Sequence, residues 1–96
     1  MEINKTINAN VVTVSLNGRL DTSSAPEVEA YLNENVEMDK NIVMDCQNLS
    51  YVSSAGLRVF LSLQKKMKDL LKFVNVGELV MEVFEMTGFC DILTIE

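Results

Sequence analysis

One stretch of this 96-residue chain constrains its fold more than any other, because an apolar run, two serines and a helical pattern follow one another closely. The run Ile42-Val43-Met44 is short and partly β-branched, as expected of a buried strand. Beyond the serines, apolar residues recur at the spacing of one helix face, namely Gly56, Val59, Phe60, Leu63 and Met67. A strand over residues 41–46 is therefore expected to lead toward the serines, and a helix to leave them.

The two serines, Ser53 and Ser54, have an ordinary structural explanation. The first backbone N–H groups of a helix have no partner within the helix, and a serine at the start can accept a hydrogen bond from one of them. We therefore predict that the helix begins near Ser53 or Ser54. Gly56 would lie in its first turn, where glycine costs roughly 1 kcal/mol relative to alanine. We expect a close approach of the helix start to the sheet, where a larger side chain such as valine would destabilise the fold, whereas alanine would stabilise it if space allows.

The segment before the buried strand predicts a hairpin and a helix. Residues 3–7 and 12–16 alternate apolar and polar around a turn at 8–10, and Gly18 is expected to end the hairpin. A loop over residues 19–23 leads to a helix whose start, Ser24-Ala25-Pro26-Glu27, has the spacing of a capping box. Its predicted inward residues are Val28, Leu32 and Val36, with Tyr31 beside them. A polar connection at 35–41 follows.

The segment after the central helix predicts two strands and a last helix. Residues 70–76 are typical of a strand, which the central helix reaches near Asp69 without an intervening glycine. The last helix is expected from Gly77 through Met86, with Gly88 as its left-handed C-terminal cap. Its predicted apolar face consists of Leu79, Val80, Val83 and Phe84. Residues 92–95 are expected to close the chain as a strand.

These elements predict an α/β fold with a central mixed sheet of about five strands, including an N-terminal hairpin, and three main helices. Residues 1–96 are expected to form one domain, with right-handed crossovers. The serine turn would then lie at the carboxyl end of a strand, where open α/β sheets commonly place their sites. The loop around Asp21 also follows the end of a strand, so we expect it beside that turn.

Composition excludes several function classes. The net charge of −6 argues against nucleic-acid binding. The chain has no histidine and only two cysteines, Cys46 and Cys90, so we expect no metal site, no cofactor and no catalysis by a thiolate–imidazole pair. No apolar run approaches the roughly 18 residues of a membrane span, and the first residues do not resemble a secretion signal. We therefore expect a cytoplasmic protein with reduced cysteines and no direct membrane insertion.

Three motifs in the right order resemble the STAS domain family, whose free-standing bacterial members are anti-sigma factor antagonists. The pattern Asp-x-x-x-Leu-Ser-Tyr-Val-Ser-Ser-Ala-Gly-Leu-Arg-Val, from Asp45 to Val59, is similar to the family signature. Residues 18–25 resemble its Gly-x-Leu-Asp loop, and residues 85–89 supply the third match. The resemblance implies the STAS fold. Family members usually have a longer, glycine-rich connection near Asp69, so either this loop is shorter or residues are missing there.

The resemblance also implies a function and a site. The serine two residues before Gly56, which is Ser54, corresponds to the one phosphorylated by the partner kinase, and Ser53 is the alternative. The implied partners are an anti-sigma factor that is a serine kinase, and a serine phosphatase acting on the phosphorylated form. Asp21 corresponds to the loop acid of the family, although a turn residue that accepts backbone N–H bonds explains it equally well. The expected partner-binding residues are Asp21, Thr22, Ser53, Ser54, Leu57 and Arg58.

Two other functions stay open from the sequence. The first is a STAS subunit of a signalling scaffold, or of a membrane lipid or anion transporter complex, with no phosphorylation. The second is an enzyme, which we do not expect, because no histidine is available as a base and the Ser, Asp and Lys residues show no spacing typical of nucleophilic catalysis.

Overall fold

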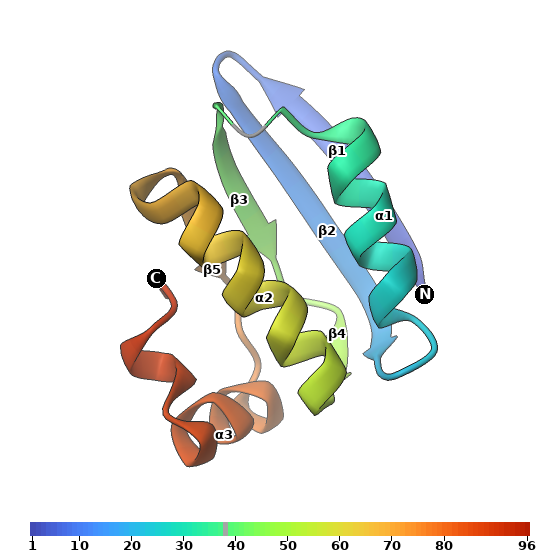
Figure 1. Cartoon of the computed structure of the whole chain (residues 1–96), viewed down its shortest axis with the longest axis vertical. Coiled ribbons are helices and arrows are strands. Elements are labelled where there is room, and N and C mark those ends of the chain that lie inside the picture. The colour runs from blue at the N-terminus through green and yellow to red at the C-terminus, as the bar shows by residue number, and fades with distance from the viewer. Residues whose placement is uncertain (38) are drawn as a thin grey trace.

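The computed structural model describes residues 1–37 and 39–96, and these form a five-stranded mixed sheet with three α-helices (Figure 1). The predicted α/β class is thus confirmed. The strands are β1 (Glu2–Asn8), β2 (Val11–Leu20), β3 (Asn41–Asp45), β4 (Leu49–Val52) and β5 (Leu71–Val74). The helices are α1 (Ala25–Asn35), α2 (Ser54–Met67) and α3 (Glu78–Thr87), with short 3-10 helices η1 (Lys68–Leu70) and η2 (Phe89–Asp91). Position 38, within the connection predicted at 35–41, lies outside the described residues.

The sheet is organised around β2, which pairs with three other strands. The order is β1-β2-β3-β5, with β1 antiparallel to β2 as the predicted hairpin, and with β4 pairing separately with β2. The first half of β2 pairs in parallel with β3, and its last residues pair in parallel with β4. Gly18 ends the hairpin as predicted, because β1 pairs with β2 only as far as Asn17, whereas strand β2 itself continues to Leu20. The register shifts between Gly18 and Arg19, and the φ of +110° at Gly18 lets β2 change its partner and continue to Leu20.

Two strand predictions need correction. Strand β4 was not predicted, although it carries the chain from β3 to α2. Conversely, residues 92–95 do not form a strand, because only the last residues of the chain come close enough to pair with β5. There Ile95 forms an isolated parallel bridge with Phe73, whose N–H donates to the Thr94 carbonyl at 2.8 Å.

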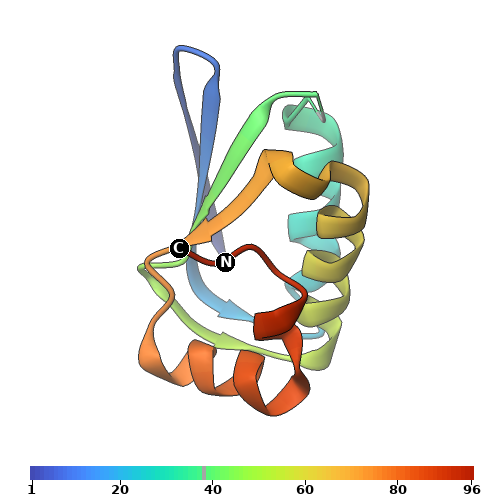
Figure 2. The same cartoon turned by 90° about the vertical axis from the view of Figure 1, so that its left-hand side faces the viewer.

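Helices α1 and α2 cover the same face of the sheet (Figure 2). Val28 and Leu32 of α1 and its C-cap residue Val36 are buried as predicted, but the predicted capping box does not form. The Ser24 hydroxyl makes no cap bond to the helix; it donates to the Arg19 carbonyl at 2.7 Å and accepts from the Asp21 N–H at 2.9 Å. The serine therefore secures the preceding loop instead of the helix.

Helix α2 supplies the centre of the core. Its Phe60 meets Phe73 of β5 and Phe84 of α3 edge-on, with ring centroids 4.9 and 6.2 Å apart, and all three rings are fully buried. The glycine-free connection after α2 is closed by η1, where Lys68 adopts a φ of +52° and its carbonyl accepts from Gln64 Nε2 at 2.8 Å. A short loop therefore suffices between α2 and β5.

Helix α3 attaches to the core through Val80 and Phe84, which are buried as predicted. Gly88 occupies the left-handed cap position with a φ of +80°, also as predicted. The prediction for Leu79 is wrong, because this side chain is 69% exposed. Fewer apolar side chains of α3 are therefore buried in the core than its sequence predicts.

Candidate functional site at the start of α2

The backbone brings the Asp21 loop and the serine turn together, as expected from the sequence. Strand β4 runs parallel to the end of β2, so that Leu20 pairs with Val52. One residue beyond Val52, the Ser53 N–H donates a hydrogen bond to the Leu20 carbonyl at 2.8 Å. Two segments about thirty residues apart in the chain therefore leave the sheet side by side, at its carboxyl end.

The two serines have different environments. The half-buried Ser53 is the N-cap of α2, and its Oγ accepts from the Gly56 N–H at 3.4 Å, which confirms the predicted start of the helix. Ser54 is the first residue of α2, and its side chain is exposed. The capping role thus falls to Ser53, and the Ser54 hydroxyl lies at the surface beside the N-terminal end of the helix.

Asp21 orders its own loop. Its Oδ1 accepts from the Ser23 hydroxyl at 2.8 Å, from the Ser23 N–H at 3.0 Å and from the Ser24 N–H at 3.1 Å. These bonds, that from the Ser23 hydroxyl most of all, lower the pKa of the carboxyl from 3.8 to about 2. The turn role considered from the sequence is therefore present, and the carboxylate stays charged at neutral pH.

Gly56 is a packing position, as predicted. A Cβ placed on it would lie 2.6 Å from Leu20 Cγ and 2.9 Å from Val52 Cγ2, both of which belong to buried side chains. No real Cβ makes contacts this short, so α2 can approach the ends of β2 and β4 only because this residue has no side chain. The same approach holds the start of α2, with Ser53 and Ser54, close to the end of β2.

The remaining predicted residues divide into surface and core. Thr22 and Arg58 are exposed, Arg58 one turn beyond Ser54, whereas Leu57 is only 5% exposed and supports the helix from within the core. A hollow of about 320 Å³ opens between the first turns of α1 and α2. It is lined by Thr22, Ala25, Pro26, Glu29, Ala55, Arg58 and Val59. Sequence reasoning missed this hollow, although the small residues Ala25 and Ala55 at two helix starts were a signal.

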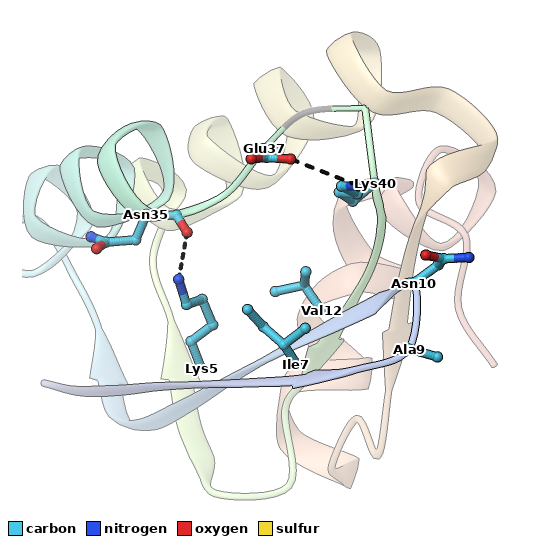
Figure 3. A pocket seen from close by; sticks show the side chains of 8 residues that line it. All are labelled: Lys5, Ile7, Ala9, Asn10, Val12, Asn35, Glu37 and Lys40. Atoms are coloured by element: carbon cyan, nitrogen blue, oxygen red, sulfur yellow. Dashed lines mark hydrogen bonds and ion pairs between the residues drawn. The ribbon is translucent and has the colours of Figure 1, made fainter.

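A second hollow, of about 290 Å³, lies near the tip of the hairpin, away from the serines (Figure 3). Lys5 Nζ donates to the Asn35 carbonyl at the end of α1 at 2.8 Å, and Lys40 Nζ lies 3.9 Å from Glu37. Both cations are thus engaged by oxygen atoms of the chain itself. The contact of Lys5 fixes the hairpin to the helix end, where a cation complements the helix dipole.

The cysteines do not contribute to the candidate site. Both are free thiols, and burial raises the pKa of Cys46 to about 12, so that its thiolate is not formed at neutral pH. Within the described ranges, no three His, Cys, Asp or Glu side chains gather closely enough to hold a metal ion. None of the helices in that part of the chain is long and apolar enough to cross a membrane.

The comparisons with known proteins agree with this fold. The STAS domain model matches residues 2–96. The anti-sigma-B factor antagonist of Bacillus subtilis is 32% identical over 91 residues, covering 92% of this chain and 84% of the relative. The corresponding antagonist of Listeria monocytogenes is 31% identical over 91 residues, covering 88% and 78%. The chain therefore belongs to the STAS domain family.

Solved structures show the same fold at lower identity. The crystal structure of an anti-sigma factor antagonist from Mycobacterium paratuberculosis superposes with a TM-score of 0.86 at 20% identity, covering 98% of this chain and 83% of that one. The Bacillus protein SpoIIAA, also an anti-sigma factor antagonist, superposes in its unphosphorylated form with a TM-score of 0.74 and in its phosphorylated form with 0.67, each at 16% identity. Both superpositions cover 99% of this chain. They cover 88% of the unphosphorylated SpoIIAA chain and 91% of the phosphorylated one.

Proposed function

We propose that this chain is an anti-sigma factor antagonist controlled by phosphorylation of Ser54. In the unphosphorylated form it binds a cognate anti-sigma factor, a serine kinase, in the cytoplasm and so frees the sigma factor. Phosphorylation ends this binding, and a serine phosphatase restores it. The curated relatives named as antagonists of an anti-sigma factor support the binding role.

The observation that carries the proposal is the division of roles between the two serines. Because Ser53 caps α2, the exposed Ser54 hydroxyl can be modified without loss of the cap. It is exposed at the carboxyl end of the sheet, where a partner can reach it. Ser54 is therefore the better candidate of the two.

The local chemistry favours a phosphate at this position. The kinase would transfer the γ-phosphoryl group of ATP to Ser54 Oγ, with loss of the hydroxyl proton and release of ADP. The product adds about −1.5 to −2 charges. It would lie close to the first N–H groups of α2, which have no intrahelical acceptor, and to the positive end of the helix dipole. Arg58, one turn further along α2, partly neutralises the added charge. The fold should therefore survive the modification.

The effect of the phosphate falls on the partner surface. We place this surface on Asp21, Thr22, Ser53, Ser54 and Arg58, with the adjoining hollow between α1 and α2 receiving a side chain of the partner. A phosphate at its centre would meet repulsion and desolvation worth a few kcal/mol, enough to change affinity by orders of magnitude.

The test is phosphorylation by the cognate kinase with ATP, followed by peptide mass mapping. Wild-type protein and the Ser53→Ala variant should each gain one phosphate on Ser54, whereas Ser54→Ala should gain none. Retention of phosphate in the Ser54→Ala protein would move the site to another hydroxyl. Absence of phosphate from all three proteins would favour the unphosphorylated STAS subunit instead.

A further inference from the structure

Helix α3 exposes an apolar stripe that the fold uses only in part, because Val83 packs partly against the core whereas Leu79 and Met86 lie largely in solvent. Leu79 and Met86 are 69% and 87% exposed, and the half-buried Val83 lies between them at the spacing of successive helical turns. The helix is already attached to the core by Val80 and Phe84 on its other side. A row of large exposed apolar side chains, beyond what attachment requires, is typical of a protein interaction site.

An acidic stripe runs beside the apolar one. Glu78, Glu82 and Glu85 are exposed and follow one another by four and three residues, so they share an adjacent face of α3. Residues 73–96 contain five of the fourteen acidic residues of the chain and none of its eight basic residues. Most of the net negative charge of the protein, −5 of −6, therefore lies in the segment that includes α3.

We propose that the α3 face, formed by Glu78, Leu79, Glu82, Val83, Glu85 and Met86, docks a basic amphipathic helix of a partner protein. The apolar stripe would pack against apolar residues of that helix, and the glutamates would pair with Lys or Arg along its edge. This interaction is separate from the serine turn and does not depend on its phosphorylation.

The negative charge of the α3 face favours a basic helix as its partner over a second copy of the chain or an anionic membrane surface. A second copy of the chain would bring the glutamates of one α3 face close to those of the other, and like charges repel. An anionic membrane surface would also repel them, since membrane-surface helices usually carry Lys and Arg on their polar face. A basic helix meets both stripes with complementary groups.

The test uses a synthetic peptide of about 18 residues, long enough for partial helicity, with leucines on one face and lysines beside them. The full chain is labelled with ¹⁵N, and amide shifts and affinity are measured with the peptide and with a scrambled peptide of equal composition. We expect shifts concentrated in residues 78–87 and weaker binding of the scrambled peptide. Affinity should fall by about tenfold in Glu82→Lys/Glu85→Lys, and similarly in Leu79→Ser/Met86→Ser.

The matched control is Glu2→Lys/Glu34→Lys, which makes the same charge change at exposed glutamates of β1 and α1. Its affinity should stay close to that of the wild type. Equal weakening by this control would overturn the proposal, because the binding would then reflect overall charge. Shifts outside α3, or sedimentation of the free protein as a dimer that Met86→Ser dissociates, would also overturn it. Circular dichroism melts confirm that every variant is folded.

Discussion

The Ser53 N–H donates to the Leu20 carbonyl at 2.8 Å, and this bond joins the two segments of the candidate site. Leu20 is followed directly by Asp21, and Ser53 directly by Ser54. The loop acid and the proposed phosphorylation site therefore each directly follow a residue of this hydrogen bond, where the paired strands β2 and β4 end. A change that moves either strand end should alter both parts of the site together.

Gly56 provides the sharpest test of this packing. Replacement by alanine should destabilise the fold by about 1–3 kcal/mol, because the new Cβ would overlap the buried side chains of Leu20 and Val52. Valine should cost more and should displace the serine turn, so that partner binding and phosphorylation fall together. Chemical denaturation of the variants gives the free energies of unfolding.

The control for this prediction is Gly77→Ser. Gly77 is the N-cap of α3, and a Cβ there meets nothing within 4 Å, so serine should be neutral or slightly stabilising. A Gly56→Ala protein as stable as the wild type would show that the start of α2 is not tightly packed.

The different environments of the two serines predict different effects on stability. Ser53→Ala removes the cap of α2 and should cost about 0.5–1 kcal/mol, toward the low end because the bond to Gly56 is long at 3.4 Å. Ser54→Ala should change stability by less than about 0.5 kcal/mol, since its side chain is exposed. Thermal melts distinguish the two, and equal losses would contradict the assignment of the cap to Ser53.

The lowered pKa of Asp21 predicts that the stability of the fold depends on pH in the acid range. Its folded pKa of about 2 lies below its ordinary value of 3.8, so its ionised form stabilises the fold. This contribution is complete above pH 4 and is lost as the pH falls through 4 toward 2. The carboxyl titration measured by NMR should therefore have a depressed midpoint. The stability difference between wild type and Asp21→Asn should shrink over the same window, and a constant difference would contradict this role.

The cysteines should react at different rates. Cys46 is fully buried with a pKa raised to about 12, whereas Cys90 is partly exposed. Brief treatment of the folded protein with iodoacetamide should therefore modify Cys90 alone, and unfolding in denaturant should release Cys46. Mass mapping of the labelled peptides checks this. Modification of Cys46 at the same rate in the native state would show that the core around β3 opens readily.

Much of this architecture could be predicted from the sequence, because periodicity reports which face of an element is buried. The helix after Ser53, the stripe of α1 and the cap at Gly88 all follow from local patterns. Strand β4 was missed because Leu49–Val52 is only four residues long and lies between residues typical of turns. Leu79 was misplaced for a different reason, since an apolar residue on a helix does not reveal which neighbours cover it.

The candidate site was only partly predictable for the same reason. Spacing could place a serine at the start of α2, but either serine fitted the cap. Only the tertiary structure separates them, through the bond from the Gly56 N–H to Ser53 Oγ. The hollow beside Arg58 also depends on the relative position of α1 and α2, which no local pattern reports.

The most direct test of the proposed switch is a calorimetric titration of the cognate anti-sigma factor with unphosphorylated protein, with Ser54-phosphorylated protein and with Ser54→Asp. The phosphorylated form should bind at least about a hundredfold more weakly, and Ser54→Asp should be weakened in the same direction, while all three keep similar melting temperatures. Equal affinity of the phosphorylated and unphosphorylated forms would contradict the proposed control of binding by Ser54 phosphorylation.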